Sequence, residues 1–366
     1  MAHYYFLLAF VWLALAASVC RTKTVDRIVL ISLVVYASLF SGLRWYSDVD
    51  YGPYSGMFDA NPDLARFGPK SVQALHGEPG YLLVTAIFKS LSLEFHAMVL
   101  FMAIIAISLK AYVADQHTKC ASLCLALYFC IHFITIEFIQ IRWGLASGLI
   151  LLACHFLQRS RVLAAQLCFA LAVGFHYFAL VFWAGALLLR LKREPVFLAA
   201  VATMTLMGLM FGTSLLNPEG QFQRELYIVR RLLSYLGNPT SQVGLLSNLR
   251  VAMYLALIYV YGSLVTGRHG NPEFVFLRRM ATLALGGAVA FEFLPIFYFR
   301  AVVLADFFAL LSLLKLCEIQ DTLEFQVPLT VGLTVLFSAW FGFDVYNNFA
   351  GYRILEYSTW IDARLF

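Results

Sequence analysis

Residues 41–81 read SGLRWYSDVDYGPYSGMFDANPDLARFGPKSVQALHGEPGY and form the longest hydrophilic segment of a chain that is otherwise largely apolar. Ser41-Gly42-Leu43-Arg44 begins the segment, Glu78-Pro79-Gly80-Tyr81 ends it, and long apolar runs flank it on both sides. Carboxylates, arginines and tyrosines gather here, although charged residues make up only 13% of the chain. We therefore expect the rest of the protein to be a scaffold that holds this loop.

Composition sets the class of protein. Hydrophobic residues account for 61% of the 366 positions, which excludes a water-soluble protein of this size. Since a bilayer span needs about 20 mostly apolar residues, we predict an all-α polytopic membrane protein with a single transmembrane domain over residues 1–366. The twelve predicted transmembrane helices are 4–20, 28–43, 95–113, 119–137, 143–158, 161–175, 176–190, 195–213, 248–267, 278–297, 300–316 and 325–343.

The segment 79–93 is apolar, but it is short for a span and contains Lys89. If it crossed the bilayer, the later clusters of arginine and lysine would lie outside the cell, against the positive-inside rule. If it is re-entrant or interfacial, those clusters all lie in the cytoplasm. We therefore predict an external loop over 44–94 that contains an interfacial helix, a second external loop over 214–247, and both termini outside.

The cations that this topology leaves outside are almost all arginines, which bind phosphate through two parallel hydrogen bonds better than lysine does. Arg44, Arg142 and Arg300 are the candidates for binding an anion. Structural roles are open for two of them. Arg142 could extend to the lipid headgroups or pair with Glu137, and Arg300 could pair with a carboxylate such as Asp306.

Three residues are candidates for proton transfer. His176 lies between two short apolar segments, and its imidazole could accept a proton from a sugar hydroxyl or simply be a packing residue. Asp50 and Glu78 are alternative bases, although Glu78 could instead cap the helix that begins at Pro79. Asp48-Val49-Asp50 matches the short metal-binding pattern of nucleotide-sugar transferases, but it lies on the wrong side of the membrane for them. We expect no metal and no cofactor.

Tyrosines in the loop are suited to stacking on sugar rings, and Tyr51, Tyr54 and Tyr81 are the candidates for binding sugar. Together with the arginines and the proton-transfer groups, they predict an external cavity for an anionic, amphipathic substrate. A lipid-linked sugar pyrophosphate meets each requirement. No nucleic acid partner is expected.

One ordered set of motifs resembles a known family. The order is Gly42-Leu43-Arg44, Asp50-Tyr51 with Tyr54 and Phe58, Glu78-Pro79-Gly80-Tyr81, Ile141-Arg142-x-Gly144-Leu145-Ala146, and Phe175-His176 with Ala179-Leu180. It resembles the EpsG/Wzy-like polysaccharide polymerases over roughly residues 40–190. The chain departs from that pattern at Val49, Trp143 and Phe178, where the family usually has threonine, glutamine and serine. These changes affect the expected polar contacts with the sugar more than the reaction.

The resemblance implies an O-antigen or exopolysaccharide polymerase with a GT-C-like membrane glycosyltransferase architecture in the bacterial cytoplasmic (inner) membrane, its site facing the periplasm or exterior. It would transfer a growing glycan from undecaprenyl pyrophosphate onto a lipid-linked repeat unit, without a metal. A chain-length regulator protein is a further candidate partner. The alternatives are a transporter (flippase) of lipid-linked oligosaccharide and a polysaccharide ligase. A flippase is disfavoured because the sequence shows no paired halves.

Overall fold

The computed structural model describes residues 2–20, 22–75, 77–215, 250, 253–254, 256–262, 271–292, 294–320, 323–351, 354–355, 357–359 and 361. Over these residues the regular secondary structure is helical, apart from two isolated β-bridges. It separates into two compact units, one of residues Met1–Leu180 with Gln320–Phe366, the other of residues Val181–Ile319. The predicted second loop, 214–247, lies outside the described residues from residue 216 onward.

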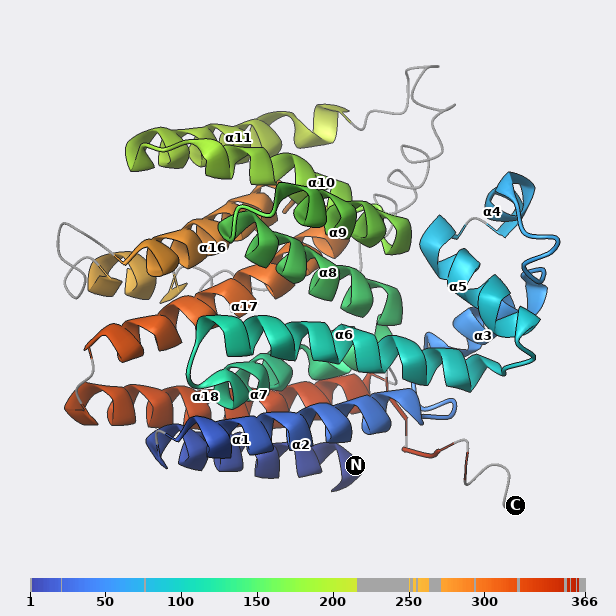
Figure 1. Ribbon diagram of the computed structural model, residues 1–366, viewed down its shortest axis with the longest axis horizontal. Helices are drawn as coiled ribbons and strands as arrows, with labels where there is room; N and C mark the ends of the chain where they lie inside the picture. Colours follow the sequence, from blue (N-terminus) through green and yellow to red (C-terminus); the bar gives the residue numbers. More distant parts are fainter. Residues whose placement is uncertain are drawn as a thin grey trace. The chain divides into compact units, whose positions relative to one another are not determined.

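The first unit contains most of the helices. Its elements are α1 (Ala2–Cys20), α2 (Lys23–Gly42), α3 (Tyr51–Ala60), α4 (Pro69–Leu75), α5 (Pro79–Ser90), α6 (Phe95–His117), α7 (Ala121–His132), the π-helix η1 (Phe133–Ile139), α8 (Ile141–Gln158), α9 (Val162–Phe175) and α18 (Leu323–Ala350). Helices α1, α2, α7 and α18 lie side by side in Figure 1, and α6 packs against both α2 and α8. This bundle therefore joins the two ends of the chain.

The second unit is built from the middle of the chain. Helix α10 (Ala179–Gly185) begins at its boundary, and the unit continues through η2 (Ala186–Arg190), α11 (Glu194–Leu215), η3 (Leu257–Tyr261), α16 (Pro272–Ala290) and α17 (Pro295–Gln320). Asn271 caps α16, since its side chain accepts hydrogen bonds from the backbone N–H groups of Glu273 and Phe274, with Pro272 at the first position. Helices α11 and α16 pack together around Phe197, Val201 and Leu283.

Five helical segments of the described residues are long and apolar enough to cross a membrane: Lys23–Gly42, Phe95–His117, Ala121–Ile139, Ile141–Gln158 and Val327–Ala350. Each overlaps a span expected from the sequence. Their length and composition are those of an all-α, multi-pass membrane protein. The finer expectations, twelve spans and a GT-C-like architecture, stay predictions.

The long polar segment folds into three short helices, α3, α4 and α5, which gather near one end of α6 in Figure 1. Helix α5 begins with Pro79, and its 12 residues measure only about 18 Å at 1.5 Å per residue, short of a hydrocarbon core about 30 Å thick. Gly80 lets α5 approach α9 closely, because a Cβ atom there would lie 2.8 Å from the carbonyl carbon of Gly174. This contact brings the end of the polar loop to the end of α9.

Candidate functional site

Arg142 and Glu78 form an ion pair between the first turn of α8 and the residue preceding α5. The guanidinium carbon of Arg142 also lies 5.0 Å from the ring centroid of Tyr54 and 5.6 Å from that of Tyr81. Its Nε donates a long hydrogen bond, 3.4 Å, to the hydroxyl of Tyr54. The Arg142 side chain keeps 16% of its surface exposed. The sequence indicated each of these four residues separately as a candidate. The fold brings them together in one cluster, called here the Arg142 cluster.

Glu78 occupies the N-cap position of α5, but its side chain makes no capping hydrogen bond. Its carboxylate binds Arg142 instead, so the contact with arginine explains the residue better than a capping role does. The other partner expected for Arg142, Glu137, forms its ion pair with Lys110, at 2.9 Å. The alternative in which Arg142 pairs with Glu137 is therefore wrong.

Asp50 lies directly before α3 and is half-buried. Burial and the neighbouring charge of Asp48 raise the pKa of its carboxyl group, and the charges of Arg142 and Arg44 oppose that rise. No described residue forms a hydrogen bond or an ion pair with its carboxylate, whereas the carboxylates of Asp48 and Glu78 are both held by arginines. Among the described residues, Asp50 is thus the carboxylate near Arg44 and Arg142 that has no such partner.

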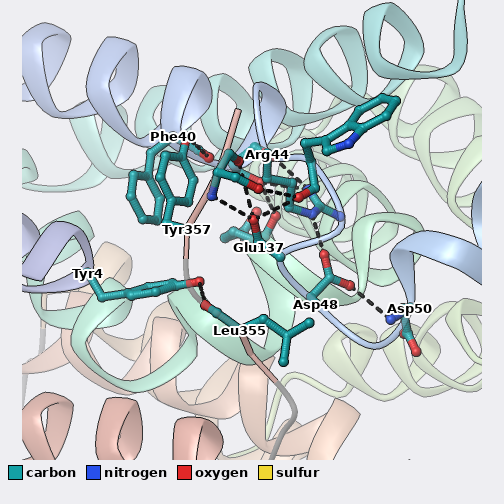
Figure 2. Close-up of polar contacts among 12 residues, drawn as sticks. Tyr4, Phe40, Arg44, Asp48, Asp50, Glu137, Leu355 and Tyr357 are labelled. Carbon is teal, nitrogen blue, oxygen red and sulfur yellow. Dashed lines mark hydrogen bonds and ion pairs between the residues drawn. The ribbon is translucent and has the colours of Figure 1, made fainter. Parts of the chain in front are cut away.

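Arg44 and Asp48 form a second ion pair, with Nε and Oδ2 2.5 Å apart and side chains only 1% and 0% exposed (Figure 2). Arg44 Nη1 donates a 2.6 Å hydrogen bond to the carbonyl of Ser41, and its guanidinium carbon lies 5.0 Å from the ring centroid of Phe138. The second carboxylate oxygen of Asp48 accepts a 2.9 Å hydrogen bond from the backbone N–H of Asp50. The Arg44–Asp48 pair is therefore held within the protein by further contacts on both side chains. No cluster of three or more potential metal ligands occurs among the described residues.

A segment near the C-terminus, residues 354–359, holds the strand-like part of the loop in place. Antiparallel bridges join Arg44 to Thr359 and Asp48 to Ile354, and the Leu355 N–H donates a 2.8 Å hydrogen bond to the carbonyl of Ser47. Figure 2 shows the ring of Tyr357 stacked on Phe40, with centroids 4.2 Å apart, and the Tyr4 hydroxyl bound to the Leu355 carbonyl. Nothing in the sequence indicated this role, because the contacts join residues more than 300 positions apart.

The three tyrosines predicted to bind sugar are all buried, with 1%, 6% and 0% exposure for Tyr51, Tyr54 and Tyr81. The last two carry Arg142 on their ring faces, while the Tyr51 ring packs on Phe95 and Tyr46. Burial raises the pKa of the Tyr54 hydroxyl, which therefore stays neutral beside the arginine. Tyr46, which is 51% exposed, offers the accessible aromatic ring next to this cluster.

His176 caps the C-terminal end of α9 and is buried. Its imidazole contacts the ring of Trp143, with centroids 5.3 Å apart, and its Nδ1 accepts a 3.2 Å hydrogen bond from the backbone N–H of Phe178. The fold thus places His176 against the residue that follows Arg142. These contacts are those of a packed histidine that supports the start of α8.

Arg300 belongs to the second unit, where it is buried with its guanidinium carbon 5.9 Å from the ring centroid of Phe297. In the same unit, Asp306 forms a 2.9 Å ion pair with Arg250. Neither Arg250 nor the Lys110–Glu137 pair was expected from the sequence. Ionisable residues inside two predicted spans, 95–113 and 119–137, could have indicated that pair.

Comparison with known proteins gives one match. The model of the EpsG family matches residues 4–359, which is nearly the whole chain and more than the stretch on which the resemblance was based. No curated protein and no solved structure matches.

Proposed function

The chain belongs to the EpsG family, which is associated with exopolysaccharide biosynthesis, and on that premise we propose that it is a polysaccharide polymerase. It transfers a growing O-antigen or exopolysaccharide chain from undecaprenyl pyrophosphate onto a lipid-linked repeat unit. The observation that carries the proposal is the cluster around Arg142, which combines a partly open arginine with two aromatic rings and lies near Asp50, a carboxylate that no described residue pairs with.

In this proposal, Arg142 binds the pyrophosphate. The hydroxyl of the acceptor sugar attacks the anomeric carbon, the bond from that carbon to the pyrophosphate oxygen breaks, and the pyrophosphate leaves with the bonding electrons. A guanidinium that is already oriented can stabilise the charge that develops on the leaving oxygen. Glu78, Tyr54 and Tyr81 orient Arg142, so the substrate need not order a long side chain.

Asp50 is our choice for the base that takes the proton from the attacking hydroxyl. A base must be ionised and within reach of its proton, and a pKa nearer neutrality makes it more effective. Asp50 meets these conditions better than Glu78, which is held by arginine, because its pKa is raised and no described residue forms an ion pair with it. His176, the other candidate base, would have to leave its contacts with Trp143 and Phe178.

The proposal also includes the membrane topology of the chain and its partners. We propose twelve spans in a GT-C-like architecture, with the Arg142 cluster facing the outside of the cytoplasmic membrane, where lipid-linked repeat units are presented. Arg44 would support this site through the loop that it holds, the reaction would need no metal, and a chain-length regulator would be a protein partner. Tyr46 would supply an aromatic face for a sugar ring.

The test is to delete the gene in its own host and to separate the surface polysaccharide by repeat number on a gel. Complementation uses the wild-type gene, Arg142→Ala, and Arg27→Met as the matched control. Arg27 also forms an ion pair, with Asp115 at 3.1 Å, but its side chain is 53% exposed and lies outside the cluster.

Chains that stop at one repeat in the deletion strain and in Arg142→Ala, with normal chains in Arg27→Met, support the polymerase. Loss of every repeat from the surface would indicate a flippase instead. Full-length polymer that remains on its lipid carrier would indicate a ligase. Equal tolerance of both arginine substitutions would remove Arg142 from the site.

A further inference from the structure

A buried ion pair lies beneath the two arginines of the polar loop and α8. Lys110 of α6 and Glu137 of η1 approach to 2.9 Å, and their side chains are 0% and 1% exposed. The Tyr128 hydroxyl donates a 3.0 Å hydrogen bond to the same carboxylate oxygen, Oε1. Charges buried in a membrane segment are costly, so a pair that persists there usually has a specific task.

The pair is connected to the backbone that carries Arg142. Lys110 Nζ donates a 2.6 Å hydrogen bond to the carbonyl of Gly144, which lies two residues beyond Arg142 in the first turn of α8. The same carbonyl accepts a 2.9 Å hydrogen bond from the Ser147 hydroxyl. Lys110 therefore fixes the start of α8 relative to α6.

The pair is connected to Arg44 as well. The carbonyl of Glu137 accepts a 2.5 Å hydrogen bond from the Ser41 hydroxyl at the end of α2, and the carbonyl of Ser41 accepts a 2.6 Å hydrogen bond from Arg44. Figure 2 shows Glu137 beside Arg44. Lys110 thus bonds to the backbone next to Arg142, while the backbone carbonyl of Glu137 is connected through Ser41 to the side chain of Arg44.

Two local features show how closely this junction is fitted. A Cβ atom on Gly144 would lie 3.2 Å from the carbonyl oxygen of Ile136 and 3.3 Å from Oε2 of Glu137, so α8 begins directly against η1. The turn that carries Glu137 is a π-helix, a rare distortion that occurs frequently at functional sites. The helix therefore departs from regular α-helical geometry at the residue whose carboxylate binds Lys110.

We propose that Lys110 and Glu137 are positioning residues that set the places of Arg142 and Arg44 for binding of the pyrophosphate. The inference rests on the proposed function for its chemistry, but its geometric part can be tested separately. A purely structural ion pair would need only charge balance. Removing both charges together would then restore both the melting temperature and the affinity for the ligand. A positioning pair also supplies the hydrogen bond from Lys110 to Gly144, which the double substitution does not restore.

The experiment uses the full chain purified in lipid nanodiscs as wild type, Lys110→Met, Glu137→Gln, the double variant and Gly144→Ala. Arg27→Met is the matched control, because the Arg27–Asp115 pair also joins α2 to α6 but lies away from the site. Three quantities are measured: the dissociation constant of undecaprenyl pyrophosphate, the melting temperature, and amide hydrogen exchange in residues 41–48 and 133–146.

We expect the affinity to fall at least tenfold in both single variants and in Gly144→Ala, with faster exchange in both segments. The double variant should regain the melting temperature of the wild type while its affinity stays low, and Arg27→Met should bind as the wild type does. Affinity that returns together with the melting temperature in the double variant, or unchanged affinity in the single variants, would overturn the inference.

A wild-type protein that does not bind undecaprenyl pyrophosphate would count against the proposed function, and hydrogen exchange then decides the positioning role alone. Faster exchange in both 41–48 and 133–146 of the double variant and of Gly144→Ala would support it. Exchange like that of the wild type in those two variants would overturn it.

Discussion

Two arginine–carboxylate pairs lie near enough to Asp50 for the charges of both arginines to act on it, and they differ in exposure. The sealed pair, Arg44 with Asp48, has side chains 1% and 0% exposed, while the open pair, Arg142 with Glu78, has 16% and 4%. Arg44 also contacts the carbonyl of Ser41 and the ring of Phe138. Arg142 has one carboxylate, one long hydrogen bond and two ring faces around it.

The difference teaches that the same pair of residue types can serve two purposes. A sealed pair is almost completely buried, and breaking it leaves an unpaired buried charge, so it maintains the architecture. An open pair keeps part of its guanidinium accessible, so an incoming phosphate can share or replace the carboxylate. The contrast predicts that substitutions in the two pairs fail in different ways.

The largest effect on activity is expected for Arg142→Ala. Loss of a preorganised group on the developing charge typically costs about 10²–10³-fold in rate. Because Glu78, with a side chain 4% exposed, loses its ion-pair partner in this variant, the rate is normalised to folded protein. Arg142→Lys should recover little, since lysine lacks the planar fork. Polymer formation from lipid-linked repeat units measures this. A lysine variant with near-normal rates would contradict a bidentate role.

Asp50→Asn comes next, with an expected loss of about 10²-fold, the lower end for general base catalysis. In the wild type the base form is lost as pH falls through the Asp50 pKa, which burial raises above that of an ordinary aspartate. The acidic limb of kcat/KM should therefore lie above the ordinary pKa of about 3.9 for an aspartate and should disappear in Asp50→Asn. The same acidic limb in both proteins would assign the base elsewhere.

Arg44→Ala should mainly lower stability, by about 3–5 kcal/mol, because Asp48 is left as an unpaired buried charge. Activity per folded molecule should fall less than tenfold. The double variant Arg44→Met with Asp48→Leu should recover part of the lost melting temperature. Thermal unfolding in detergent, with activity normalised to folded protein, separates these effects. A stable Arg44→Ala protein without activity would show that Arg44 acts on the substrate after all.

The smallest effect is expected for Tyr54→Phe, which keeps the ring under Arg142 and removes one hydroxyl at 3.4 Å from its Nε. A hydrogen bond of ordinary strength corresponds to about 0.5–1.5 kcal/mol, or roughly 2–12-fold in activity. Tyr54→Ala should lose more, because the ring face is removed as well. Equal losses in the two variants would mean that the hydroxyl, rather than the ring, supports the arginine.

The sequence predicted a good part of the open pair and its surroundings. Arg142, Glu78, Asp50, Tyr54 and Tyr81 were all singled out, since polar groups in an apolar chain are costly and stand out. Their partners could not be read from the sequence, because an ion pair depends on which helices pack together. The alternative in which Glu137 pairs with Arg142 was wrong for this reason: α6 packs so that its Lys110 forms the ion pair with Glu137.

The exposure of the aromatic residues could not be predicted from the sequence. Tyrosines in a polar loop were expected to face a sugar, yet Tyr54 and Tyr81 are buried beneath a guanidinium, and Tyr46 is the accessible ring. Composition indicates that aromatic rings are present, but exposure depends on the turn each one occupies. Tyr46 has a positive φ of 46°, a backbone conformation that sequence patterns do not reveal for a tyrosine.

The segment at 354–359 has a consequence for how the protein is made. Ser47 and Ser358, which hydrogen-bond to each other, are 311 positions apart, so the ribosome completes the loop long before it makes the residues that hold it. The sealed pair can reach its final form only after α18 has been synthesised and has entered the bundle. Chains still under synthesis would therefore lack the finished arrangement of this loop until the bundle is closed.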